Sequence, residues 1–210
     1  MLTGTAYGIA LNDKRERESL SAAFDIAPYG RPPIAPVLYI KPRNCIASTG
    51  ATVAIPPSAE RVRACGTLGV LAGRDITAGD TDPLGAIAAV CLAVDISLAT
   101  QNYYRPALTE SCRDGFLPLG RFSAVPDDLA AIEIVTTIDG TEAHRWRLDQ
   151  LHRDVVYILR DVSSFMTISA GDLFLVGLAG DAPTVTAGQR MTIAAGQLPG
   201  IDVTFSEEAR

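Results

Sequence analysis

The amino-acid sequence predicts an α+β fold that is mostly β, with a few short helices. Three observations predict this class: short apolar or alternating runs are frequent, turn residues separate them, and only two segments have clear helical spacing. The 210 residues are 48% hydrophobic and 20% charged, which is typical of a folded chain and not of a disordered one. We expect a single domain over residues 1–210, with enough length to bury a sizeable core.

The amino-terminal segment, residues 1–36, is expected to contain a strand, a short helix and a proline-rich connection. Apolar side chains recur at alternate positions in residues 3–11, which predicts the strand. A helix is predicted over residues 14–24, because Asp13 can accept hydrogen bonds from the free amides of a first helical turn. Residues 28–36 contain the prolines of the connection.

The β core is expected over residues 37–205. Its strands are predicted from apolar or alternating runs at residues 37–40, 52–55, 61–72, 86–96, 131–138, 143–147 and 173–178. Asp139-Gly140 is a strong hairpin signal between two of these strands. A last short strand is predicted at residues 203–205, followed by an acidic tail, residues 206–210, with little structure.

The second helix is predicted over residues 150–165, where apolar side chains recur at helical spacing. Asp149 precedes it and can cap its first turn. The two histidines, His144 and His152, flank this region. Neither has a Cys or Ser partner nearby in the sequence, so exposed or structural roles are favoured over catalysis.

Composition argues against two classes of partner. The net charge is −6, from 24 acidic residues against 18 Lys and Arg, and no basic cluster is present, so a nucleic-acid surface is not expected. The sequence has no apolar run of 18 residues and no signal-peptide pattern at its start, so we expect no membrane contact and a cytoplasmic location. The four cysteines are scattered, which favours free thiols over a disulfide framework or a zinc site.

One charged stretch, residues 104–120, lies between two apolar strand-like runs. Ten residues at its centre contain four charged side chains, Arg105, Glu110, Arg113 and Asp114, and Gly and Pro occur around them. A binding site on a rigid scaffold and a solvated surface connection explain this pattern about equally well. For Arg105, whose planar guanidinium suits bidentate carboxylate binding, ligand contact is slightly favoured; for Asp114, structural hydrogen bonds are slightly favoured.

The same stretch carries a resemblance. Its sequence Arg-Asp-Gly-Phe-x-Pro-Leu-Gly, residues 113–120, resembles the signature of the fumarylacetoacetate hydrolase family. Four further pieces fit in order, at residues 4–12, 27–29, 32–33 and 40–44. Within the family, the nearer resemblance is to the bifunctional isomerase/decarboxylases of 4-hydroxyphenylacetate breakdown, to the first subunit or the amino-terminal half.

The resemblance implies a mixed β-sandwich roll in which residues 1–36 form a lid segment. It also implies a function as a subunit of a 5-carboxymethyl-2-hydroxymuconate isomerase and 5-oxopent-3-ene-1,2,5-tricarboxylate decarboxylase system. Two alternatives stay open: a catalytically silent structural partner of an active subunit, and a repurposed metal-independent lyase or isomerase. The implied partners are a small di- or tricarboxylate 2-oxo acid and either a second copy of the chain or a catalytic family subunit.

The resemblance implies a divalent cation, Mg, Mn or Ca, held by two glutamates on one strand face and by a later aspartate. In this sequence Cys65 and Thr67 stand at the positions of the two glutamates, and Asp95 at that of the aspartate. A thiol and a hydroxyl do not replace two carboxylates around a hard cation. We therefore expect that Asp95 binds a metal weakly and that the chain holds no metal tightly.

The remaining site positions also depart from the family pattern. The early segment, where members of the family carry a catalytic His and Glu, has Glu16 and Glu18 but no His. Ser111 stands where active hydrolases often have a Lys, and Leu178 where they have a Thr. The candidate substrate-binding residues are Lys41, Arg105 and Ser111, and the candidate catalytic residues are Arg105, Arg113 and Asp114. A solvated Lys41 at a strand end remains a nearly equal alternative.

Overall fold

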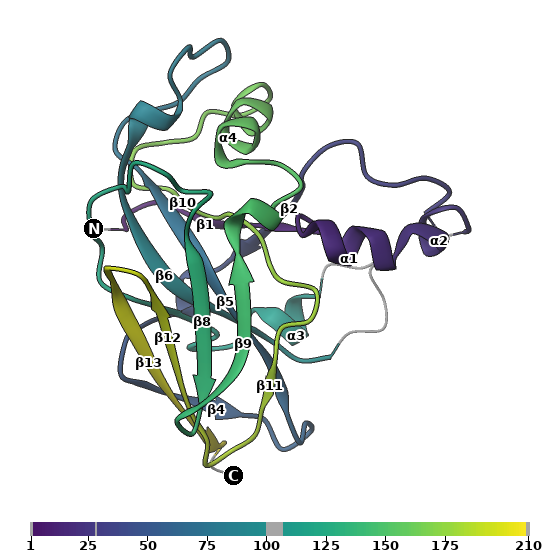
Figure 1. The fold of residues 1–210 in the computed structure, drawn as a ribbon, viewed down its shortest axis with the longest axis vertical. Helices are drawn as coiled ribbons and strands as arrows, with labels where there is room; N and C mark the ends of the chain where they lie inside the picture. Colours follow the sequence, from purple (N-terminus) through teal and green to yellow (C-terminus); the bar gives the residue numbers. More distant parts are fainter. Residues whose placement is uncertain (1, 28, 100–106, 209–210) are drawn as a thin grey trace.

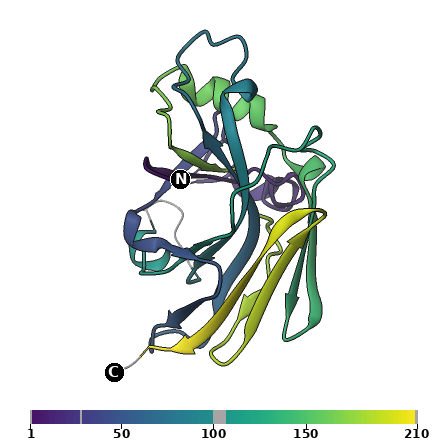
Figure 2. The same ribbon diagram turned by 90° about the vertical axis from the view of Figure 1, so that its left-hand side faces the viewer.

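The computed structural model describes residues 2–27, 29–99 and 107–208, and it is mostly β, as the sequence predicts. Its strands form two sheets that pack face to face (Figures 1 and 2). The first sheet has the order β2-β1-β10-β5-β6-β7-β3, with β11 added beside β5. Its strands are β1 (Ala6–Ala10), β2 (Val37–Lys41), β3 (Ile46–Ser48), β5 (Val62–Ala72), β6 (Ile87–Ser97), β7 (Leu117–Leu119), β10 (Leu173–Leu175) and β11 (Thr184–Val185).

The antiparallel pair of β5 and β6 forms the centre of the first sheet. Nearly every residue of both strands is buried, which explains why their sequences are apolar runs without strict alternation. The register places Cys65 directly opposite Asp95, and Thr67 opposite Ala93. Since side chains directly opposite each other share a face, this register decides which groups meet in the site described below.

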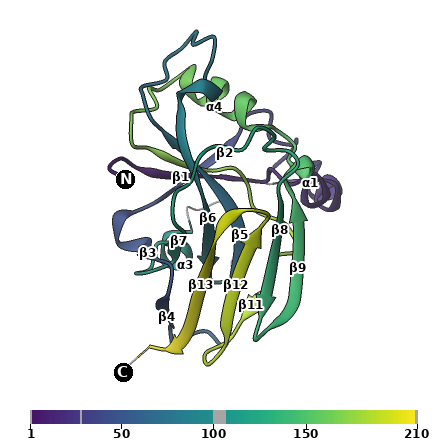
Figure 3. The same cartoon turned by 60° about the vertical axis from the view of Figure 1, so that its left-hand side comes forward.

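The second sheet has the order β4-β13-β12-β8-β9, and its strands lie side by side in Figure 3. They are β4 (Ala51–Ile55), β8 (Glu133–Ile138), β9 (Thr141–Arg147), β12 (Arg190–Ala195) and β13 (Leu198–Glu207). The predicted hairpin is confirmed, with Asp139 at φ 50° and Gly140 at φ 82° between β8 and β9. Both turn residues have the positive φ that matches the twist of a two-residue hairpin.

The prediction for the carboxyl end was wrong. The last strand, β13, covers ten residues and not three, and Ser206 and Glu207 belong to it instead of to an unstructured tail. They pair in parallel with Ala54 and Ile55 of β4. The long-range partner of this segment is more than 150 residues away, so the local pattern, interrupted by Pro199, did not reveal the strand's length.

Both predicted helices are shorter than expected. The first is broken at Leu20 into α1 (Lys14–Ser19) and α2 (Ser21–Phe24), although Asp13 caps it as predicted, accepting from the amides of Arg15 and Glu16. The second, α4 (Val155–Ser163), begins five residues late and is capped by Asp154, not by Asp149. The remaining short helices are η1 (Arg43–Cys45), η2 (Leu84–Ala86), α3 (Leu108–Ser111) and η3 (Leu148–Gln150).

The main core lies between the two sheets. It joins Leu68 and Leu92 of the first sheet to Ile193, Val203 and Phe205 of the second. Helix α4 covers one end of the molecule, and α1 lies along one side (Figure 1). No helix among the described residues is both long and apolar enough to span a lipid bilayer.

The first sheet curls strongly, and this curl builds the site. Strands β2 and β6 are four positions apart in the strand order. In a flat sheet that separation would be about 19 Å, at about 4.8 Å per strand. The side chain of Lys41 on β2 nevertheless touches Asp95 on β6. The edge strand therefore folds back over the sheet.

Candidate functional site

The centre of the site is a buried ion pair between Lys41 and Asp95. The Lys41 ammonium nitrogen lies 3.1 Å from Asp95 Oδ1, and both side chains are almost fully buried. The ammonium also donates to the carbonyl oxygens of Ile96 at 2.8 Å, Ser111 at 2.9 Å and Phe116 at 3.3 Å. A buried charge is tolerated when it is paired and hydrogen-bonded in this way. Lys41 therefore fixes the end of β6, α3 and the loop before β7 around Asp95.

The second oxygen of Asp95 accepts a hydrogen bond from Tyr39. The Tyr39 hydroxyl donates to Asp95 Oδ2 at 2.8 Å. Burial, together with the negative charge of Asp95, raises the pKa of Tyr39 well above its ordinary value, so the phenol is neutral. Its ring crosses strand β1 at Gly8, where a Cβ atom would lie only 2.0 Å from Tyr39 Cζ. Only glycine leaves room for this crossing.

The two positions where the resemblance implies metal ligands hold neutral groups. Burial raises the pKa of the Cys65 thiol to about 12, although the nearby Arg63 guanidinium opposes the shift. The Thr67 hydroxyl donates to the carbonyl oxygen of Gly177 at 2.6 Å. Neither side chain carries a negative charge near pH 7.

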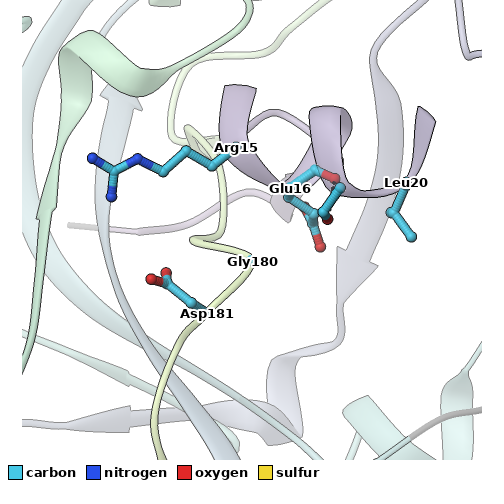
Figure 4. A pocket seen from close by; sticks show the side chains of 6 residues that line it. Arg15, Glu16, Leu20, Gly180 and Asp181 are labelled. Carbon is cyan, nitrogen blue, oxygen red and sulfur yellow. Dashed lines mark hydrogen bonds between the residues drawn. The ribbon is translucent and has the colours of Figure 1, made fainter.

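A cleft of about 400 Å³ lies between α1 and the segment that follows β10. Figure 4 shows Glu16 on α1 directed toward this segment, and Arg15 and Asp181 at one end of the cleft. Glu16 Oε2 is buried and lacks a hydrogen-bond partner among the described residues. Burial raises the pKa of Glu16, and the positive charge of Arg63 partly opposes this. At Gly180 a Cβ atom would lie 2.6 Å from Glu16 Cβ, so glycine permits the close approach of helix and segment.

The predicted charged stretch is only partly described. Arg105 lies outside the described residues. Arg113 Nε donates to the carbonyl oxygen of Thr109 at 3.0 Å, and Asp114 Oδ1 accepts from Asn44 Nδ2 at 2.8 Å. These bonds hold the loop together. The catalytic roles predicted for the three residues remain predictions.

The structure brings together several of the residues singled out from the sequence, among them Lys41, Cys65, Asp95 and the backbone of Ser111. The Ser111 hydroxyl donates to the carbonyl oxygen of Ala107 at 2.6 Å and stabilises α3. Ligand contact by Lys41 and Ser111 remains a prediction. In the structure both of them hold Asp95 and its surroundings in place.

Sequence reasoning missed two groups of the site, Tyr39 and Arg63. The alternation of β5 could have found Arg63, because it lies two residues before Cys65 and shares its strand face. The local sequence contains no signal for Tyr39. Its contact with Asp95 depends on the curl of the first sheet.

Residues 5–205 match the family described as fumarylacetoacetate (FAA) hydrolase, C-terminal. This match covers almost the whole chain. The chain belongs to the fumarylacetoacetate hydrolase family.

Among curated relatives, this member of the family is 32% identical over 202 residues to a 4-hydroxyphenylacetate degradation bifunctional isomerase/decarboxylase of Salmonella dublin. The match covers 96% of this chain and 47% of the relative. The homoprotocatechuate catabolism bifunctional isomerase/decarboxylase of Escherichia coli is 31% identical, over 99% of this chain and 48% of the relative. The chain thus spans about half the length of these relatives.

Solved structures share the fold. A 5-carboxymethyl-2-hydroxymuconate delta-isomerase from Mycobacterium smegmatis has a TM-score of 0.82 at 21% identity, covering 100% of this chain and 81% of that one. A fumarylpyruvate hydrolase from Pseudomonas aeruginosa, in complex with Mn²⁺ and pyruvate, has a TM-score of 0.80 at 18% identity, over 98% and 90% of the two chains. In residues 2–27, 29–99 and 107–208 of the present chain, no three His, Cys, Asp or Glu side chains are grouped to hold a metal.

Proposed function

We propose that this chain is a subunit, or one half, of an isomerase/decarboxylase acting on 5-carboxymethyl-2-hydroxymuconate or 5-oxopent-3-ene-1,2,5-tricarboxylate in 4-hydroxyphenylacetate catabolism. The similarity to the bifunctional isomerase/decarboxylases over nearly the whole chain carries this proposal. The substrates are small 2-oxo di- and tricarboxylates or their enols. The proposal includes a cytoplasmic location and assembly with a second copy or with a catalytic family subunit.

The proposed function includes a degenerate metal site. Asp95 is already neutralised by Lys41 and accepts from Tyr39, so its carboxylate is engaged by protein groups. Cys65 is a neutral thiol and Thr67 donates to a backbone carbonyl. A hard divalent cation prefers several anionic or carbonyl oxygens. The donors present do not fit such an ion, and no step of the proposed chemistry passes through one.

Glu16 is the proposed proton carrier of the reaction. Isomerisation of a 2-oxo acid requires that a proton be removed next to the carbonyl group and returned at another carbon. A carboxyl group serves both steps best when its pKa lies close to the working pH, and burial moves the pKa of Glu16 in that direction. Among the described residues, its Oε2 beside the cleft has no hydrogen-bond partner that would hold the proton.

A second candidate function is that of a catalytically silent partner for an active family subunit. The contacts of Lys41 favour this silent role. Its ammonium already has four protein acceptors, so it is a structural group and not a substrate ligand. The span of about half the bifunctional relatives also favours it, since a second half would supply the chemistry.

Keto–enol isomerisation by the purified chain, assayed in EDTA, tests the first candidate. We expect turnover by the wild type and a loss of at least 100-fold in kcat for Glu16→Gln. Glu18→Gln is the matched control, because Glu18 is an exposed glutamate of the same helix, and it should retain activity. No turnover by the chain alone, with turnover on addition of an active family subunit, would establish the silent partner instead.

A further inference from the structure

Arg63 lies on the face of β5 that forms the site. Residues 63, 65 and 67 point to the same side of the strand, because strand side chains alternate. Arg63 therefore shares a face with Cys65 and Thr67, the two positions where the family resemblance implies metal ligands. It introduces a fixed positive charge into this row.

The charge of Arg63 acts on three side chains of the site. The guanidinium lowers the pKa of Glu16, of Cys65 and of Tyr39, although burial outweighs it at each group. These three residues come from α1, β5 and β2, so Arg63 lies among groups that approach from three elements. Lys41, the cation beside Asp95, is fully engaged by Asp95 and three carbonyl oxygens, whereas Arg15 lies at the outer end of the cleft.

Most N–H donors of the Arg63 guanidinium form no hydrogen bond within the described residues. Within the described part of the chain it forms one hydrogen bond, to the carbonyl oxygen of Ala179, and no ion pair. A guanidinium carries five N–H donors. Glu16 Oε2 likewise has no partner there, and no ion pair joins it to Arg63 despite their attraction. Ala179 is followed by Gly180 and Asp181, which line the cleft. Arg63 does not line the cleft itself, but its bond to Ala179 places it directly behind the lining segment, across the cleft from Glu16.

We propose that Arg63, at the inner side of this cleft, binds the carboxylate of a 2-oxo acid that enters through it and supplies the positive charge that metal-bearing members of the family obtain from a divalent cation. The proposal deepens the proposed function and rests on it for the choice of ligand class. The planar fork of a guanidinium matches the two oxygens of a carboxylate. Glu16 is then placed beside the bound acid.

Oxalate, a stable planar analogue of a 2-oxo acid enolate, is the probe. Its binding to the EDTA-treated full chain is measured by calorimetry for the wild type, Arg63→Gln and Arg63→Lys. We expect binding without metal, a loss of at least tenfold in affinity for Arg63→Gln, and a smaller loss for Arg63→Lys, which keeps the charge but not the fork. Arg147→Gln is the matched control: Arg147 is exposed and pairs with Asp149, so the affinity should change less than twofold.

A purely structural role for Arg63, tying β5 to Ala179, gives a different pattern. Both Arg63 variants would then lower the melting temperature, and folded Arg63→Lys would bind oxalate as the wild type does. That result overturns the proposal, as does oxalate binding that appears only after Mn²⁺ is added. If Arg63→Gln does not fold, the oxalate affinity of Arg63→Lys shows whether Arg63 binds the carboxylate. Metal-free oxalate binding through Arg63 without turnover would uphold this inference and contradict the proposed isomerase.

Discussion

At the residue scale, the Lys41–Asp95 ion pair is buried on both sides and held by several hydrogen bonds. Lys41 reaches Asp95 on the interior strand β6 from the edge strand β2 of a curled sheet and is fully buried there. Removing one partner of such a pair leaves an uncompensated charge in the interior, which costs far more than the pair itself contributes.

The substitution Lys41→Met should therefore lower the free energy of unfolding by about 3–5 kcal/mol in urea denaturation. Methionine fills the space but leaves Asp95 unpaired. Lys14→Met is the control, because Lys14 is exposed and its ammonium donates to the carbonyl oxygen of Asp149 on the surface. A loss below about 1 kcal/mol for Lys41→Met would show that Asp95 is protonated or hydrated and does not need the ammonium.

Thiol reactivity tests the description of Cys65. With a pKa of about 12, Cys65 is almost entirely protonated at pH 8, and it is also buried, so iodoacetamide should leave it unmodified. Cys112 is the internal comparison, since it is only half-buried and should react first. Peptide mapping by mass spectrometry measures both. Rapid labelling of Cys65 in the folded chain would contradict the neutral, enclosed thiol.

At the element scale, local sequence signals predicted where the helices and strands lie better than they predicted where each one begins and ends. The strand pair β5–β6 and the Asp139-Gly140 hairpin were predictable, because a long apolar run and a two-residue turn are local features. The start of α4 was not. Asp149 and Asp154 both precede apolar residues at helical spacing, and only the 3-10 turn at residues 148–150 selects the later one.

The cap assignment predicts a difference between two aspartates. Asp154→Ala should destabilise the chain by about 1 kcal/mol, because the amide of Tyr157 loses its acceptor. Asp149→Ala, at the position predicted from the sequence, should change the stability by less than about 0.5 kcal/mol, since its contacts are exposed. Chemical denaturation of both variants measures the two losses in the free energy of unfolding. Equal losses would contradict the cap at Asp154.

At the scale of the whole molecule, the site exists only because the first sheet curls. Cys65, Thr67 and Asp95 share one face through the β5–β6 register, and this much could be anticipated from alternation and the family resemblance. Tyr39 and Lys41 join them from β2, four positions from β6 in the strand order, and Glu16 joins them from α1. No local pattern encodes those approaches, because they depend on the path of the entire sheet.

The buried thiol of Cys91 predicts that the stability of the fold is sensitive to alkali. Burial raises the pKa of Cys91 from 9.0 to about 12. The stability that Cys91 contributes is fully present below pH 9 and is lost as the pH rises toward 12, because only the unfolded chain ionises there. The stability difference between wild type and Cys91→Ala should therefore shrink by about 2 kcal/mol between pH 8.5 and 10.5. An unchanged difference over this range would contradict the shifted pKa.

In the proposed site, the protein cations Lys41 and Arg63 replace a divalent ion. Calorimetric titration of the purified, EDTA-treated chain with Mn²⁺ tests it most directly, with elemental analysis of the protein as isolated. We expect no stoichiometric metal and no binding tighter than about 1 mM, because Asp95 is already paired and Cys65 is neutral. One Mn²⁺ per chain bound at micromolar concentration, together with turnover that depends on it, would show that the site holds a divalent ion and not only protein cations.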